Sequence, residues 1–277
     1  MPPIPDLPLA ADSGRMPKLG LGTWPMKGAE CQGAVEAAIA LGYRHIDTAE
    51  MYGNEEEVGA GIAASGQPRD SLFVTTKVWW DHLTPDGIRA ACEASLAKLK
   101  LDHVDLYHIH WPSPDIDLDA ALGAMARLKE EGRAKAIGVC NFPAGLLRKA
   151  LATGAPIACV QVEHHIYLTQ ERLLAVTREA GIPLTSYSPT AKAAGESDPV
   201  MQGIARKHGC TPTQAALAWL LEMEGVSAIP KAATAKNQRA NLEAVSVHLD
   251  DEDRRAIAAL PKDKRIVNPG FHPDWNA

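Results

Sequence analysis

Short β-like runs alternate with amphipathic helical segments from residue 19 to residue 245, and this alternation limits the fold more than any other feature of the sequence. Eight runs are predicted as strands, at residues 19–23, 44–48, 72–77, 105–111, 136–141, 159–164, 184–188 and 227–231. The helical patterns cover residues 30–41, 54–65, 84–99, 118–131, 144–152, 169–180, 199–208, 211–223 and 235–245. Strands that alternate with helices form a parallel sheet.

Eight such units in a chain of this length predict a closed (β/α)₈ barrel, as a single domain over residues 1–277. A doubly wound sheet is the competing fold. It usually opens with a G-x-G-x-x-G turn, whereas the first strand here continues as Leu-Gly-Leu-Gly-Thr-Trp without the third glycine. The Pro-rich segment before Leu19 is expected to form a small cap over the barrel bottom. The tail after Pro261 shows no helical period, and Phe271 and Trp275 suggest that it packs near the active-site rim.

Composition, charge and cysteine spacing argue against several classes of function. A net charge of −6 and the lack of a basic stripe argue against nucleic-acid binding. The five cysteines are scattered without CxxC spacing, which argues against a disulfide framework or structural zinc site and fits a reducing cytosol. The first residues have no signal-peptide pattern, and no apolar run approaches the roughly 18 residues of a membrane span. We therefore expect a cytoplasmic, monomeric protein with no membrane association.

Four polar side chains stand at or just after the ends of three consecutive predicted strands. Asp47, Lys77 and His110 end the second, third and fourth strands, and Tyr52 follows five residues after Asp47. Active sites of β/α barrels lie at this end, so the four should converge. A Lys ammonium held by an Asp would lower the pKa of a neighbouring phenol. Tyr52 could then protonate a carbonyl oxygen while a hydride reaches the carbon, and His110 could donate a second hydrogen bond to that oxygen.

The motifs around these residues resemble the aldo-keto reductase family over nearly the whole chain. The resemblance rests on residues 42–59, 75–77, 106–112, 137–142, 160–163 and 229–231. Within the family it is greatest to the short bacterial 2,5-diketogluconate (methylglyoxal) reductase group, because of the brief loop after Trp111 and the ending over residues 264–275. The resemblance implies a metal-free, ordered reduction of small aldehydes, α-keto aldehydes or keto sugars by NADPH, with NADH as a weaker alternative. Its catalytic tetrad maps onto Asp47, Tyr52, Lys77 and His110.

The resemblance also implies cofactor contacts. Asn141 and Gln161 should hydrogen-bond the nicotinamide carboxamide, Tyr187 should stack on the ring, and Lys231 should meet the 2′-phosphate. The full implied set is Thr23, Trp24, Asp47, Cys140, Asn141, Gln161, Tyr187, Ser188, Lys231, Thr234, Asn237 and Asn241. The substrate pocket is expected to be walled by Trp24, Tyr52, Trp79, His110 and Trp111.

Three positions depart from the family's usual residues. Cys140 stands where Ser is usual beside the Asn, and a thiol is a weaker hydrogen-bond partner. Ala232 and Asn237 stand where many members have a Ser and a phosphate-clamping Arg. Asn cannot bind a phosphate bidentately as Arg does, so the preference for NADPH over NADH should be modest. Thr234, Lys236 and Arg239 could compensate.

Two other functions are open. His108 and His110 form an H-x-H pair such as barrel metallohydrolases use to bind zinc. The pair lies on the fourth predicted strand instead of the first, and His164 and His165 lack a well-placed acidic ligand, so we expect no metal. His108 is more simply a barrel-interior residue with a local hydrogen-bond partner. The second alternative is a non-catalytic NADP(H)-sensing subunit, against which the intact tetrad argues.

Overall fold

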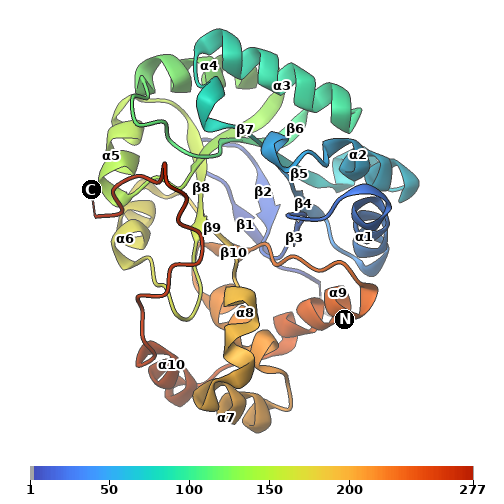
Figure 1. Ribbon diagram of the computed structural model, residues 1–277, viewed down its shortest axis with the longest axis vertical. Helices are drawn as coiled ribbons and strands as arrows, with labels where there is room; N and C mark the ends of the chain where they lie inside the picture. Colours follow the sequence, from blue (N-terminus) through green and yellow to red (C-terminus); the bar gives the residue numbers. More distant parts are fainter. Residues whose placement is uncertain (1–2, 277) are drawn as a thin grey trace.

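The computed structural model describes residues 3–276 and places eight parallel strands in chain order around a barrel (Figure 1). These strands are β3 (Leu21–Gly22), β4 (His45–Asp47), β5 (Phe73–Val78), β6 (Val104–Ile109), β7 (Ala134–Cys140), β8 (Ile157–Glu163), β9 (Leu184–Tyr187) and β10 (Val226–Ala228). Each pairs with the next in parallel register, for example Lys77 of β5 with His108 of β6.

Isolated parallel bridges close the barrel between its first and last strands. Leu19 pairs with Ala228 and Gly22 pairs with Lys231, and the Gly20 amide donates to the Ala228 carbonyl at 2.9 Å. The predicted (β/α)₈ barrel is therefore confirmed. Its first and last strands are shorter than predicted, because only part of each run forms a continuous ladder.

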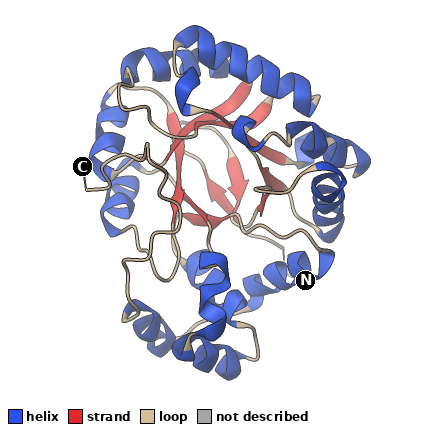
Figure 2. Cartoon of the chain, viewed as in Figure 1, coloured by secondary structure: helices blue, strands red, loops and turns tan. Residues whose placement is uncertain are grey.

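Helices surround the barrel as an outer layer (Figure 2). They are α1 (Gly28–Leu41), α2 (Glu55–Ala64), α3 (Pro85–Leu99), α4 (Leu118–Glu130), α5 (Ala144–Ala152), α6 (Glu171–Ala180), α7 (Pro199–His208), α8 (Pro212–Glu222), α9 (Ala235–Glu243) and α10 (Asp251–Ala258). Short 3₁₀ helices are η1 (Glu50–Tyr52), η2 (Arg69–Ser71), η3 (Trp80–His82), η4 (Ala191–Ser197) and η5 (Ala244–Ser246). The Thr84 and Thr211 side chains cap α3 and α8, and a proline follows each of them in the first helical turn.

The sequence predicted no helix over the residues of α10. Its start is a capping box in which Asp250 and Asp253 each accept the other's backbone amide at 3.0 Å. Such a box satisfies two of the amides that a helix start leaves open. The Asp250-x-x-Asp253 spacing was therefore the available signal, although a box usually carries Ser or Thr followed by Glu or Gln.

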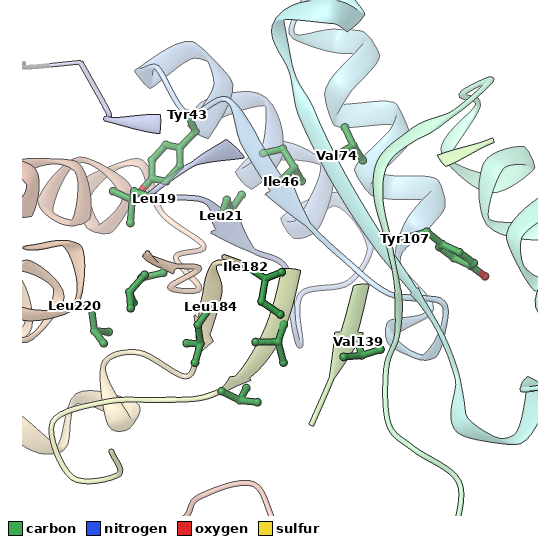
Figure 3. Packing of buried hydrophobic residues seen from close by; sticks show 14 of the residues in the cluster. Leu19, Leu21, Tyr43, Ile46, Val74, Tyr107, Val139, Ile182, Leu184 and Leu220 are labelled. Atoms are coloured by element: carbon green, nitrogen blue, oxygen red, sulfur yellow. The ribbon is translucent and has the colours of Figure 1, made fainter. Parts of the chain in front are cut away.

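The apolar core lies between the strands and the helices (Figure 3). The barrel interior is more polar, and two glycines make room for its imidazoles. A Cβ added at Gly138 would lie 2.4 Å from the His108 ring, and one at Gly20 would lie 2.7 Å from the His45 ring. A Cβ atom does not approach another non-bonded heavy atom this closely in real proteins. The backbone at Gly138 and Gly20 can therefore lie against the neighbouring imidazole ring only because each residue is glycine.

The N-terminal segment closes the barrel bottom, as predicted. It forms an antiparallel hairpin of β1 (Asp6–Pro8) and β2 (Arg15–Pro17). Leu9 and Met16 of this segment are buried against Phe73, Leu106 and Ala158 of the barrel. The hairpin therefore closes the barrel at the amino ends of the strands, and the carboxyl ends of the strands form the open face.

Candidate active site

A cavity of about 500 Å³ opens at the carboxyl ends of the barrel strands. Its volume suits a small-molecule site. It is lined by Gly22, Thr23, Trp24, Pro25, Asp47, Met51, Tyr52, His110, Trp111, Asn141, Gln161, Tyr187, Ser188, Pro189, Thr190, Lys192, Ile229, Lys231 and Val267. The sequence therefore predicted most of the strand-end lining and missed much of the loop lining.

Asp47 and Lys77 form a buried ion pair beneath this cavity. Lys77 Nζ lies 2.5 Å from Asp47 Oδ1, and the two side chains are 1% exposed or less. Lys77 Nζ also donates to the Thr48 carbonyl at 2.8 Å, and Gln161 Nε2 donates to Asp47 Oδ2 at 2.8 Å. Burial lowers the pKa of Lys77 most, but the charge and hydrogen bond of Asp47, together with Tyr52 and Cys140, outweigh burial and hold that pKa above its usual value.

Tyr52 ends η1 and brings its hydroxyl to the same point. The hydroxyl oxygen lies 3.4 Å from Lys77 Nζ. Lys27 supports the turn by donating to the Tyr52 carbonyl. Burial raises the pKa of Tyr52 to about 12, although the Lys77 ammonium lowers it. The sequence predicted that Lys77 would lower the pKa of Tyr52, but the effect of burial is larger and raises it. The hydroxyl therefore keeps its proton at neutral pH.

His110 follows β6 and completes the group. Its ring packs edge-on against Tyr52 at 5.4 Å and against Trp79 at 5.1 Å between ring centroids. Burial, with Lys77 and His108 adding to it, holds the pKa of His110 well below its usual value. The ring is therefore neutral. Its Nδ1 is buried and has no hydrogen-bond partner within the residues that the structure describes, which leaves Nε2 as the nitrogen available to the cavity.

Three amide and phenol side chains line the adjacent part of the cavity. Asn141 Nδ2 donates to the His110 carbonyl at 2.9 Å, and the Tyr187 hydroxyl donates to Asn141 Oδ1 at 2.8 Å. Asn141 has φ 62°, a left-handed conformation that Asn tolerates better than most residues. With Gln161 bonded to Asp47, these contacts join the predicted carboxamide site to the predicted catalytic group in one network.

Other predicted cofactor residues are more dispersed. Thr23 lines the cavity, and its hydroxyl donates to the Asp47 carbonyl at 3.0 Å. Ser188 and Lys231 also line it. Lys192, which the sequence reading missed, gives the cavity a further cation on η4. No periodic pattern marks Lys192, because it lies in a stretch of three left-handed residues, Ala191–Ala193.

Four predicted cofactor residues are not among the residues that line the cavity. Cys140 is fully buried, and burial holds the pKa of its thiol well above the usual value. Thr234 caps α9 by accepting the Asn237 amide at 3.3 Å. Asn237 is exposed on the first turn of that helix, and Asn241 is 6% exposed on its inner side.

Aromatic side chains form the outer rim. Trp24 is 48% exposed and packs against Tyr52 with ring centroids 5.2 Å apart. Trp111 lines the cavity, whereas Trp79 packs behind His110 and is not among the lining residues. Trp80, for which the sequence suggested no role, stacks on Phe271 of the tail at 5.2 Å. The tail therefore lies at the rim, as predicted.

The H-x-H pair has no supporting ligand set. No group of three or more His, Cys, Asp or Glu residues that could hold a metal ion was found within residues 3–276. His108 lies inside the barrel as expected, but the prediction of a local hydrogen-bond partner is wrong. Both ring nitrogens are buried without a partner in the described part of the chain, because the ring fits against the bare backbone of Gly138.

The fold and the family match together define the class of this protein, which is a (β/α)₈-barrel oxidoreductase. The model of the aldo/keto reductase family matches residues 18–262. Methylglyoxal reductase DkgB from Escherichia coli O157:H7 is 42% identical over 266 residues, which cover 94% of this chain and 99% of the relative. The chain therefore belongs to the aldo/keto reductase family, whose members generally use NAD(P)H to reduce carbonyl groups.

Two further similarities extend this result. An aldo-keto reductase from Mycolicibacterium smegmatis is 38% identical over 257 residues, which cover 92% of this chain and 93% of that one. The crystal structure of a putative 2,5-diketo-D-gluconic acid reductase B superposes with a TM-score of 0.93 at 39% identity, covering 98% of both chains.

No helix in the described part of the chain is both long and apolar enough to cross a bilayer.

Proposed function

We propose that this protein reduces small aldehydes, α-keto aldehydes or keto sugars with NADPH, and that Tyr52 is the general acid. The observation that carries the proposal is the position of the Tyr52 hydroxyl, 3.4 Å from the buried Lys77 ammonium and at the wall of the cavity. The substrate classes are supported by the names of the relatives, which are called methylglyoxal and 2,5-diketo-D-gluconic acid reductases.

The residues present fit a nicotinamide cofactor. Asn141 and Gln161 offer amide groups beside the catalytic group, and the Tyr187 ring lines the same part of the cavity. Lys192 and Lys231 supply cations elsewhere along the lining, where phosphates would bind. When bound, the cofactor would supply the hydride. The protein's own part is to bind the carbonyl oxygen near Tyr52 and to exclude water from the reacting atoms.

Tyr52 would give its proton to the carbonyl oxygen, which becomes the alcohol oxygen of the product. The phenolate left behind is stabilised by the Lys77 ammonium, which Asp47 keeps charged. The neutral His110 would donate a hydrogen bond from Nε2 to the same oxygen and so orient it. Tyr52 and His110 thus act on one oxygen atom, while Lys77 and Asp47 act on Tyr52, and none of the four needs to change its charge before the substrate arrives.

A panel of carbonyl substrates, assayed with NADPH and with NADH, tests this function directly. We expect turnover of methylglyoxal and of keto sugars with NADPH, and no loss of activity with EDTA. A metal-dependent hydrolase would lose activity with EDTA and would not oxidise NADPH. A sensing subunit would bind NADPH and show no turnover with any carbonyl in the panel.

The preference for NADPH over NADH should be modest and should increase in Asn237→Arg. Lys231 offers a point charge, whereas a guanidinium at position 237 would add a bidentate phosphate contact. Charge-assisted hydrogen bonds contribute about 1.5–3 kcal/mol, so affinity for NADPH should rise roughly tenfold or more. Fluorescence titration of both cofactors measures this. Equal gains for NADPH and NADH would show that residue 237 does not face the 2′-phosphate.

The monomeric state and the location in a reducing compartment stay predictions. The five cysteines are free, which is compatible with a reducing compartment but does not establish one.

A further inference from the structure

The C-terminal tail, residues 261–276, forms part of the active-site wall. In Figure 1 the tail leaves α10 and runs past α6 and β8 toward α5. Val267 of the tail lines the cavity. The Phe271 ring packs against Trp79 at 5.6 Å and Trp111 at 5.7 Å between centroids. The position of the tail therefore determines the shape of the rim around His110 and Trp111.

A buried carboxylate hydrogen-bonds the tail beside the cavity, in addition to the Lys264 amide, which donates to the Tyr167 carbonyl at 3.1 Å, and Lys262 Nζ, which donates to the Ile166 carbonyl at 2.6 Å. Glu163 is the last residue of β8 and is fully buried. Its Oε1 accepts the Ile266 amide at 2.7 Å, and its Oε2 accepts the Val267 amide at 2.8 Å. His165 Nε2 lies 3.0 Å from Oε1. The two oxygens therefore bind two consecutive peptide groups of the tail.

Because Glu163 is buried, its hydrogen bonds to the tail should contribute strongly to holding the tail in place. A buried carboxylate is strongly unfavourable unless it is hydrogen-bonded or paired, and bonds to a charged acceptor are about twice as strong as neutral ones. The Arg265 guanidinium lies 3.7 Å from the centroid of the Trp275 ring, and Trp275 Nε1 donates to Asn268 at 2.8 Å. These two contacts join one part of the tail to another, so they do not attach it to the barrel.

We propose that Glu163 is a positioning residue that latches the tail against the barrel mouth and thereby places Val267 in the cavity wall and Phe271 against Trp111, at the substrate end. The inference rests on the proposed reductase function for its kinetic consequence, but the latch itself does not. Glu163 is not among the residues that line the cavity, so we expect it to act on the substrate through the tail. Asn141 and Gln161 are held by other partners, so the cofactor end should not depend on it.

Glu163→Gln tests the latch. The amide keeps the shape of the side chain but turns one acceptor into a donor that faces a backbone amide. We expect faster hydrogen–deuterium exchange in peptides that cover residues 265–276, and no change in barrel peptides away from Glu163 and its neighbour His165. We also expect a KM for the carbonyl substrate about tenfold higher, equivalent to about 1.4 kcal/mol, with kcat reduced less than about threefold and the NADPH dissociation constant within about twofold of wild type.

Two further variants isolate the cause. Glu179→Gln makes the same charge change on the exposed face of α6, where Glu179 pairs with Arg148 at 2.8 Å, and should change neither measurement. Ile266→Pro removes the donor amide from the tail side without altering the barrel, so it remains informative if Glu163→Gln does not fold. It should reproduce both the exchange and the KM effects.

The outcomes separate the latch from the reductase function. Unchanged exchange of the tail in both Glu163→Gln and Ile266→Pro would overturn the latch, whatever the activity. Faster exchange of the tail in both variants with an unchanged KM would overturn the role of Glu163 in shaping the substrate end of the cavity. If the wild type reduced no carbonyl, the proposed function would fail, while the exchange measurement would still decide whether Glu163 holds the tail.

Discussion

Tyr52→Phe is expected to lower kcat for carbonyl reduction by about 10²–10⁴-fold, the usual contribution of a general acid. The substitution removes only the hydroxyl, which lies 3.4 Å from Lys77 Nζ. The remaining ring can still pack against Trp24 and His110, so folding and cofactor binding should be retained. Steady-state kinetics at saturating NADPH, together with a fluorescence titration of the cofactor, measure the two effects separately.

Tyr107→Phe is the matched control. Tyr107 is fully buried, and its hydroxyl has no hydrogen-bond partner among residues 3–276. Removing that hydroxyl should leave kcat unchanged, and it should not lower stability, because no hydrogen bond is lost. Near-wild-type turnover of the Tyr52→Phe variant would rule out Tyr52 as the proton donor.

The pKa of Tyr52 adds a pH dependence to the same prediction. Because burial raises this pKa to about 12, the acid stays protonated throughout neutral and mildly alkaline pH. Reduction should therefore not lose its acid below about pH 11. The reverse oxidation of an alcohol needs the phenolate as base, so its rate should rise with pH over the same range. A reduction rate that titrates away near neutral pH would contradict this pKa.

The sequence predicted the barrel well because the alternation of strands and helices and the strand-end polar residues are both local patterns. Asp47, Lys77 and His110 end successive parallel strands, and such ends always meet on one face of a barrel. The hydrogen bond from Gln161 to Asp47 was less accessible, because the two residues are 114 positions apart.

The remaining parts of the site come from segments without periodicity. Lys192 and Val267 line the cavity from irregular loops, where neither strand nor helix spacing indicates which way a side chain points. The role of Glu163 depends on backbone amides of the tail, and every residue except proline carries an amide, so the sequence gives no sign of this contact. The missing partners of His108 likewise follow from the close fit with Gly138, a contact between two strands.

Lys77→Met is expected to abolish turnover and also to destabilise the fold. Removing one partner of a buried ion pair leaves the other charge uncompensated, which typically costs about 3–5 kcal/mol. Asp47 would keep only the Gln161 amide as a side-chain donor. Activity should fall at least as far as in Tyr52→Phe, because no ammonium remains to stabilise the phenolate. Denaturant unfolding and steady-state kinetics measure the two losses.

The double variant Asp47→Asn/Lys77→Met distinguishes these two losses. The asparagine that replaces Asp47 carries no charge, and its side-chain oxygen can still accept the Gln161 amide. The free energy of unfolding should therefore recover much of its loss, since the effects of substituting residues in direct contact are not additive. Turnover should not recover, because the ammonium is still absent. If activity returned together with stability, Lys77 would serve the fold and not the proton transfer.

A Lys at a barrel strand end can also form a Schiff base with a carbonyl substrate, and the ion pair argues against that here. Asp47 holds the pKa of Lys77 above its usual value, so the amine is protonated and is a poor nucleophile. Borohydride added to wild-type protein with substrate should leave no covalent adduct on Lys77 by mass spectrometry. A trapped adduct would replace the electrostatic role of Lys77 with covalent catalysis, and it would also explain a loss of turnover in the double variant.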